Sequence, residues 1–169
     1  MLKRIQTKRM CAEGGAFAIV ASRYNACYVD AMLRAAQAEL KRAGAENIQV
    51  VRVPGAYEIP VVAAKLAQAD APRAPLLAPR PSFSAIICLG VILRGETVHA
   101  AHIGDAVSRA LMDIQLETKV PVVHEVLLLE NEAQARARCL SRTHNRGTEA
   151  AQTALAMARV MAALSGGRR

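Results

Sequence analysis

The residues best suited to chemistry lie between 94 and 99, where the chain reads Arg-Gly-Glu-Thr-Val-His directly after a long apolar run. A strand that enters a helix through such a glycine turn points free backbone N–H groups and the positive helix end at one spot, which suits phosphate. His99, just beyond the turn, can transfer protons near neutral pH. Glu96 opposes an anion electrostatically unless only its N–H group is used. The first hypothesis is therefore a phosphate site beside a proton carrier.

Two other apolar runs also end in polar and aromatic residues. Residues 22–25 read Ser-Arg-Tyr-Asn, and residues 55–58 read Gly-Ala-Tyr-Glu. Because only 3% of the chain is aromatic, each tyrosine is a candidate to stack on a planar ligand, although a tyrosine that caps the core fits Tyr24 equally well. For Glu58, a carboxylate that favours a helix N-terminus is the simpler interpretation.

Histidine and arginine spacing adds two further signals. His99 and His102 are three residues apart, but the sequence offers no third ligand at a suitable spacing, so no metal site is expected. Arg138, Arg142 and Arg146 recur every four residues, which is typical of a solvated helix face. One of these guanidinium groups could equally serve a phosphate as a planar bidentate donor.

Alternating strand and helix patterns must position these residues. Apolar runs predict strands at 16–22, 48–53, 84–93 and 120–129, and helical spacing predicts helices at 29–43, 58–69, 97–114, 131–141 and 147–164. Right-handed crossovers between the strands give an α/β three-layer sandwich, a four-stranded parallel sheet flanked by helices on both faces. Ligands bind such sheets beyond the carboxyl ends of the strands. One site should therefore be shared by the loops that start near Ser22, Pro54, Arg94 and Leu129.

Length and composition indicate one domain. A chain of 169 residues with 53% hydrophobic residues can bury a sizeable core. Of its 22 basic residues, six lie within 1–9 and 168–169, which leaves 16 against 14 acidic residues in the body. Because no internal basic stripe is interleaved with aromatic residues, binding to nucleic acid is not expected. Residues 1–14 and 165–169 are expected to be flexible ends, and 70–82, with four of the seven prolines, a surface insertion.

Cysteine use and hydropathy bear on location. The four cysteines include no C-x-x-C pair, and Cys88 lies within an apolar run, where a buried thiol is the expected role. No stretch reaches the roughly 18 apolar residues of a membrane span, and the charged N-terminus is not followed by the apolar segment of a secretion signal. A reduced, cytoplasmic protein without membrane contact is expected.

Taken in order, the motifs resemble those of the 6,7-dimethyl-8-ribityllumazine synthase family, which catalyses the penultimate step of riboflavin biosynthesis. The resemblance spans about Phe17 to Leu164, and its most specific elements are Val-Pro-Gly-Ala-Tyr-Glu-Ile-Pro and Arg-Gly-Glu-Thr-Val-His. It implies the lumazine synthase fold, a flavodoxin-like arrangement, with residues 1–169 as a single domain. The matching segments are 22–25, 53–60, 90–99, 115–122 and 145–151.

The resemblance also implies a reaction. The family condenses 5-amino-6-(D-ribitylamino)uracil with 3,4-dihydroxy-2-butanone 4-phosphate and releases phosphate and water. Because the amine of the first substrate attacks the ketone of the second, no cofactor is implied. Family members form homo-oligomers, pentamers or multiples of pentamers, with each site between adjacent subunits, and riboflavin synthase is a candidate partner.

The resemblance further assigns a role to each matching position. His99 is the catalytic proton carrier, Glu149 is a candidate to orient it, and Arg146 is a candidate neighbour of the pyrimidine. The phosphate is assigned to the backbone of Glu96, to Thr97 and to Arg138. The pyrimidine and its ribityl chain are assigned to Tyr24, Asn25, Ala56, Tyr57, Glu58, Val91, Ile92 and Leu93, with His124 supplied by a neighbouring chain.

Several positions differ from the usual family pattern. Ala100 and Ala101 stand where an aromatic and an acid are usual, His124 replaces a phenylalanine that lines the site, and Glu125 replaces a common glycine. These differences leave a second interpretation open, a flavin- or lumazine-binding homologue with weakened catalysis. A third interpretation is an unrelated phosphate-binding α/β module whose basic ends bind nucleic acid.

Overall fold

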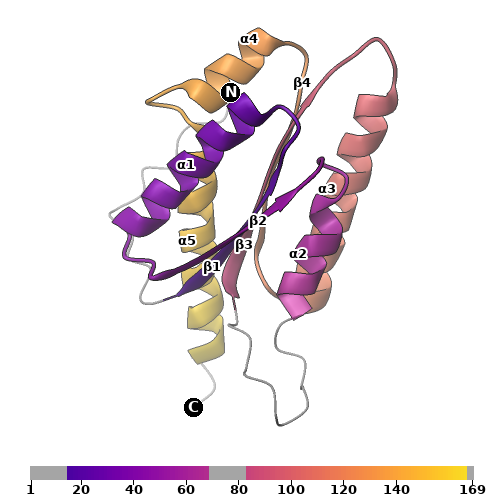
Figure 1. Ribbon diagram of the computed structural model, residues 1–169. Helices are drawn as coiled ribbons and strands as arrows, with labels where there is room; N and C mark the ends of the chain where they lie inside the picture. Colours follow the sequence, from indigo (N-terminus) through magenta and orange to yellow (C-terminus); the bar gives the residue numbers. More distant parts are fainter. Residues whose placement is uncertain (1–14, 69–82, 167–169) are drawn as a thin grey trace.

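The computed structural model describes residues 15–68 and 83–166, and its four strands form one parallel sheet in the order β2-β1-β3-β4 (Figure 1). The register pairs Ser22 with Val53 and Leu93 with Leu129, so the carboxyl ends of neighbouring strands meet along one edge of the sheet. The predicted parallel α/β sandwich is confirmed. The strands are β1 (Ala16–Ser22), β2 (Asn47–Val53), β3 (Phe83–Leu93) and β4 (Val122–Leu129).

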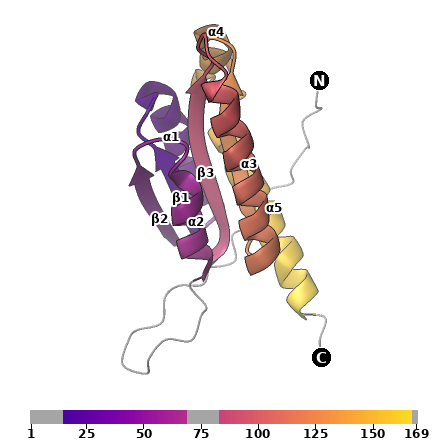
Figure 2. The same ribbon diagram turned by 90° about the vertical axis from the view of Figure 1, so that its right-hand side faces the viewer.

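Helices α1, α4 and α5 cover one face of the sheet, and α2 and α3 cover the other; Figure 2 views the molecule from the α2–α3 side. Successive strand residues point to opposite faces, so Ile19 and Leu89 pack toward α1 and α5, while Val20 and Cys88 pack toward α2 and α3. Within the described ranges, no helix is both long and apolar enough to cross a membrane. The helices are α1 (Ala26–Arg42), α2 (Ile59–Ala67), α3 (His99–Thr118), α4 (Glu132–Ala135), the π-helical turn η2 (Arg136–Leu140) and α5 (Arg146–Gly166).

The helical spacing in α1 correctly predicts which side of the helix is buried. The side chains that recur every three or four residues face the sheet and α5, and Gly44 follows the helix at φ 88°. Glycine adopts this left-handed conformation without steric cost and so ends the helix, as expected. The buried residues of this stripe are Val29, Met32, Leu33, Ala36 and Leu40.

Element boundaries differ from the predictions at several places, and helix α3 continues to Thr118 instead of 114. β4 begins at Val122 instead of 120, because Lys119, at φ 61°, and Pro121 turn the chain after α3. The helix predicted at 131–141 is one turn of α-helix followed by the π-helical turn η2. Helix α5 continues to Gly166, two residues into the predicted tail. The predicted flexible ends at 1–14 and 167–169 and the insertion at 70–82 lie outside the described residues.

Candidate active site

The loops after β1 and β2 form one wall of the carboxyl edge of the sheet. The backbone N–H of Tyr24 donates to the carbonyl oxygen of Pro54 over 3.1 Å. The Tyr24 ring lies on Gly55, where an added Cβ would come within 3.1 Å of the ring carbon Cδ2. Tyr24 and Tyr57 are 72% and 63% exposed. Both rings are therefore accessible to a planar ligand.

Asn25 joins this wall to β3. It precedes α1 and adopts the left-handed φ of 56°, which asparagine tolerates better than most residues. Its side-chain Nδ2 donates to the carbonyl oxygen of Val91 over 2.9 Å. Because Val91, Ile92 and Leu93 end β3, this hydrogen bond places the tyrosine loop beside the strand end that was predicted to contact the pyrimidine.

Glu58 lies at the start of α2, as the simpler interpretation of its sequence position expects. Its Oε2 accepts a hydrogen bond of 2.8 Å from the backbone N–H of Gly55. This bond satisfies a backbone donor of the turn and keeps the carboxylate near the positive end of the helix. Glu58 and Tyr57 are exposed at the edge, whereas Ala56 is buried.

The N-terminus of α3 completes the carboxyl edge. Thr97 Oγ1 accepts from the backbone N–H of His99 over 3.4 Å, and Glu96, Thr97 and His99 are exposed. The first turn of α3 contains no acidic residue, so its own carboxylates do not neutralise the positive end of this 20-residue helix. An anion beside a histidine fits this geometry. Among residues 15–68 and 83–166, no three His, Cys, Asp or Glu side chains gather to hold a metal.

A second group of charged residues lies where β4 meets α5. Arg146, the first residue of α5, donates from Nε to Glu125 over 2.6 Å and from Nη1 to Glu149 over 2.7 Å. Glu125 is 4% exposed, and burial raises the pKa of its carboxyl despite the attraction of Arg146. Burial alone would lower the pKa of Arg146, but the two carboxylates outweigh it and raise that pKa, so the guanidinium stays charged. Arg138, exposed on η2, attracts the Glu125 carboxylate as well.

Glu149 bonds Arg146 and does not reach His99 within one chain. Glu149 lies in the first turn of α5 and His99 begins α3, and these helices cover opposite faces of the sheet (Figure 1). Within a single chain, Glu149 therefore does not orient His99, which is the role that the family resemblance suggests for it.

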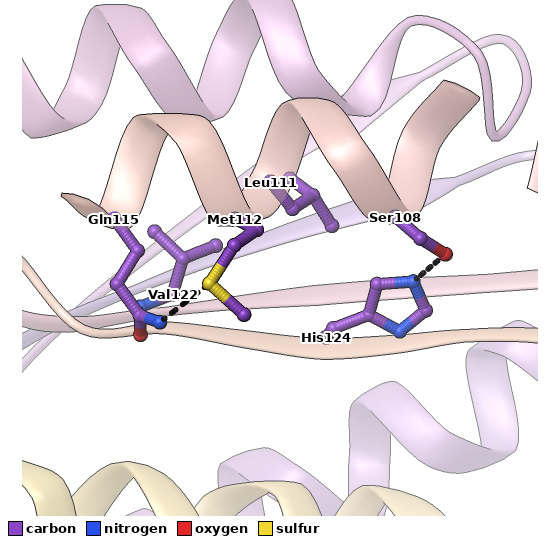
Figure 3. Close-up of a pocket in the computed structure, with 6 residues that line it drawn as sticks. All are labelled: Ser108, Leu111, Met112, Gln115, Val122 and His124. Carbon is purple, nitrogen blue, oxygen red and sulfur yellow. Dashed lines mark hydrogen bonds between the residues drawn. The ribbon is translucent and has the colours of Figure 1, made fainter. Parts of the chain in front are cut away.

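His124 precedes Glu125 on β4, and its side chain contacts α3. Its Nε2 is 2.9 Å from Ser108 Oγ (Figure 3). The Ser108 hydroxyl also donates to the carbonyl oxygen of Gly104 over 2.7 Å. The contact with Ser108 ties the His124 ring to α3. The pair lines a cavity of about 320 Å³ between α3 and β4 together with Leu111, Met112, Gln115 and Val122.

The strand register separates His124 from the carboxyl edge. His124 pairs with Cys88, five residues before Leu93, which is roughly 17 Å along a strand. A single chain therefore does not bring His124 to Tyr24 or His99.

The predicted site residues thus form two groups. The strand-end group lies at the carboxyl edge and comprises Tyr24, Asn25, Ala56, Tyr57, Glu58, Val91, Ile92, Leu93, Glu96, Thr97 and His99. The β4 group lies on and beside that edge strand and comprises His124, Glu125, Arg138, Arg146 and Glu149. The fold and the first group define a class of protein, a flavodoxin-like α/β domain with its polar and aromatic residues at the carboxyl ends of a parallel sheet.

Comparison with known proteins identifies the family within that class. Residues 14–162 match the 6,7-dimethyl-8-ribityllumazine synthase family. The 6,7-dimethyl-8-ribityllumazine synthase of Xanthomonas oryzae pv. oryzae (strain PXO99A) is 40% identical over 147 residues, which cover 86% of this chain and 88% of that protein. That of Desulfotalea psychrophila is 39% identical over 155 residues, which cover 90% and 93%. The chain belongs to the 6,7-dimethyl-8-ribityllumazine synthase family.

Two residues in or beside the β4 group gain importance only from the structure. Glu125 is a difference from the family pattern, but its ion pair with Arg146 joins residues 21 positions apart. Ser108 carries no sequence signal, because a serine on a helix face is common and its contact with His124 depends on how α3 packs on β4. The carboxylate that follows His124 within the mainly apolar run 122–129 is the one clue that the sequence offers.

Proposed function

We propose that this chain condenses 5-amino-6-(D-ribitylamino)uracil with 3,4-dihydroxy-2-butanone 4-phosphate to form 6,7-dimethyl-8-ribityllumazine, with release of phosphate and water. The observation that carries the proposal is the convergence on one sheet edge of two exposed tyrosines, a helix whose first turn contains no acidic residue, and His99. The planar substrate needs aromatic side chains on which to stack, and the phosphorylated substrate needs a helix N-terminus that binds its anion. Both must lie close together for the two substrates to react.

The ring system binds at the β1 and β2 side of the strand-end group. Tyr24 and Tyr57 stack on the pyrimidine, and Asn25, held by its bond to Val91, presents its amide to the polar edge of the ring. Glu58 and the buried Ala56 border the ribityl chain, and the backbone of Ile92 and Leu93 meets the ring beyond the end of β3.

The phosphate of the second substrate binds at the start of α3. The N–H of Glu96, the hydroxyl of Thr97 and the positive helix end supply donors and potential there. Arg138 of an adjacent copy adds a guanidinium to the same phosphate. Glu96 contributes its backbone only, since its carboxylate would repel the anion.

Catalysis rests on holding the two substrates in contact, with proton transfer added. The amine of the pyrimidine attacks the ketone carbon, and the adduct loses one water to form an imine. Phosphate then leaves, and the second nitrogen attacks the remaining carbonyl carbon and closes the ring with loss of a second water. His99 takes the proton from the attacking amine and returns protons to the departing groups. The enzyme supplies neither a nucleophile nor a cofactor in this scheme.

We infer that the complete site is formed by two copies of the chain, because His124 pairs with Cys88, five residues before the end of β3, and Glu149 bonds Arg146 instead of His99. The side of the molecule that carries His124 suits such a contact: β4 is an edge strand, and Met112, Leu116 and Leu128 on α3 and β4 are exposed apolar side chains. We place a neighbour's strand-end group against this side, in a homo-oligomer of one or more pentamers. Cytoplasmic location is part of the proposal, since the free thiols of Cys27, Cys88 and Cys139 suit a reducing compartment.

The direct test mixes the purified chain with both substrates and follows lumazine fluorescence against the spontaneous reaction, with native mass spectrometry of the assembly. Product formation above the spontaneous rate supports the proposal. Binding of the lumazine product without turnover would instead identify a binding homologue, which the alanines at 100 and 101 leave open.

A complementation experiment tests the shared site. His99→Ala and Arg138→Ala remove residues from different groups, so each variant alone should be impaired. Co-assembled in equal amounts, they should recover up to about a quarter of the unmodified activity, because about a quarter of the interfaces then combine two intact halves. No recovery on co-assembly would contradict a site formed between copies.

A further inference from the structure

The contact between Glu125 and Arg146 is the least expected ion pair of the described residues. Glu125 is 4% exposed on β4, in a strand whose neighbouring side chains are mainly Val and Leu. Arg146 begins α5 and is held by two carboxylates at once, Glu125 at Nε and Glu149 at Nη1. These carboxylates come from different elements, a strand and a helix.

Fastening α5 to β4 does not by itself explain the pair. A buried carboxylate gives up its hydration, and an apolar pair of similar volume generally fastens two elements at least as well. What two carboxylates do provide is geometry, because the guanidinium is planar and bonds at two of its nitrogens fix its plane.

The fixed guanidinium keeps one nitrogen unused. Within residues 15–68 and 83–166, Nη2 of Arg146 makes no hydrogen bond, and the side chain is 32% exposed. Nη2 is thus an unused donor on a partly exposed side chain that two carboxylates hold at its other nitrogens. Its direction is set before any ligand arrives.

The charge of the cluster indicates which ligand atom this donor suits. One guanidinium and two carboxylates make the cluster unattractive to an anion while both acids are ionised. Arg138 is exposed on η2 and makes no ion pair within the described part of the chain, so it is the better anion ligand of the two arginines. A neutral acceptor, such as a carbonyl oxygen, suits Arg146.

We propose that Glu125 is a positioning residue that, together with Glu149, holds the Arg146 guanidinium so that Nη2 donates to a carbonyl oxygen of the pyrimidine substrate and not to the phosphate of its partner. The inference rests on the proposed function and adds to it a role for Glu125, a carboxylate that stands where the family commonly has glycine.

Steady-state kinetics with each substrate varied in turn test the proposal. Glu125→Ala should raise KM for the pyrimidine about tenfold and leave KM for the butanone phosphate unchanged, because a freed guanidinium no longer donates from a fixed position. Glu125→Gln should show a smaller rise, since its amide oxygen still accepts from Nε. Arg138→Ala, the matched control, should raise KM for the phosphate substrate alone.

A double-mutant comparison separates positioning from simple structural support. If Glu125 acts only through Arg146, the Glu125→Ala/Arg146→Ala protein should have the same pyrimidine KM as Arg146→Ala alone. Additive effects would overturn the proposal, as would an equal rise of both KM values in Glu125→Ala. Thermal unfolding and native mass spectrometry establish that each variant folds and assembles. If Glu125→Ala does not assemble, Glu125→Gln is used for the test instead.

Binding distinguishes failure of this inference from failure of the proposed function. If the unmodified chain forms no product, the proposed function fails, and the inference is then tested by fluorescence titration with 6,7-dimethyl-8-ribityllumazine, which keeps the pyrimidine carbonyls. Weaker binding by Glu125→Ala and unchanged binding by Arg138→Ala support the inference. Equal binding by Glu125→Ala and the unmodified chain, or no binding by the unmodified chain, overturns it.

Discussion

The side-chain Nδ2 of Asn25 donates to the backbone carbonyl oxygen of Val91 over 2.9 Å, across 66 residues of sequence. The bond connects the loop after β1 to the end of β3. It fixes the loop that carries Tyr24, so less ordering of that loop is needed when a substrate binds. Asn25 also has the one non-glycine left-handed backbone among the described loops at this edge.

Substitution of Asn25 should separate the contribution of its hydrogen bond to Val91 from that of its left-handed backbone. Asn25→Ala loses the hydrogen bond, worth about 1 kcal/mol, and places alanine at φ 56°, which costs roughly another 1 kcal/mol. Asn25→Gly, the matched control, loses the bond but relieves the backbone cost. Chemical denaturation should therefore rank stability as native, glycine variant, alanine variant, while both variants bind the pyrimidine more weakly. Equal stability of the two variants would show that the left-handed backbone is not strained.

His99→Ala should slow turnover and leave binding of the pyrimidine largely intact. General acid–base groups contribute roughly 10²–10⁴-fold, but the positioning of the two substrates survives in this variant, so we expect a loss near the low end or below, about 10- to 100-fold. The measurement is kcat together with a binding titration for the pyrimidine. Unchanged kcat would remove His99 from the role of proton carrier.

The sequence could predict the sheet and the strand-end group because both depend on local order. Apolar runs predict the strands. Because ligands bind beyond the carboxyl ends of parallel strands, the loops at Ser22, Pro54 and Arg94 can be predicted to share one site even when the distances between them are unknown. The β4 group could not be assembled in this way. The bond from Glu125 to Arg146 and that from Ser108 to His124 depend on which residues face each other across packed elements.

Stability against pH should reveal the buried carboxyl of Glu125. Burial raises the pKa of this carboxyl in the folded chain, so between the ordinary carboxyl value near 4 and the raised value the folded state binds more protons than the unfolded state. The free energy of unfolding should therefore fall as pH rises through this window. Glu125→Gln should show a flatter profile there, measured by urea denaturation at constant protein concentration. Parallel profiles would contradict the raised pKa.

Two helical glycines should respond in opposite ways to alanine. A Cβ at Gly147 would overlap the carbonyl oxygen of Met32, where α5 crosses α1, so Gly147→Ala should cost about 3 kcal/mol or more or prevent folding. At Gly104 in α3 the nearest atom to a new Cβ is Leu128 Cδ2 at 3.6 Å, an ordinary contact. Gly104→Ala should therefore stabilise the chain by up to about 1 kcal/mol through helix propensity. Thermal unfolding of both variants checks the contrast, and destabilisation by both would contradict it.

Gly55→Ala should impair the site while the fold survives. A Cβ at Gly55 would lie 2.9 Å from Glu58 Oε2 and 3.1 Å from Tyr24 Cδ2, and both neighbours are exposed side chains that can move aside. The cost to stability should therefore be small, about 1 kcal/mol, but the stacking ring and the carboxylate would leave the positions that they hold in the strand-end group. We expect a raised KM for the pyrimidine, an unchanged KM for the butanone phosphate and near-native thermal unfolding. An unchanged KM for the pyrimidine, or an equal rise of both KM values, would contradict this prediction.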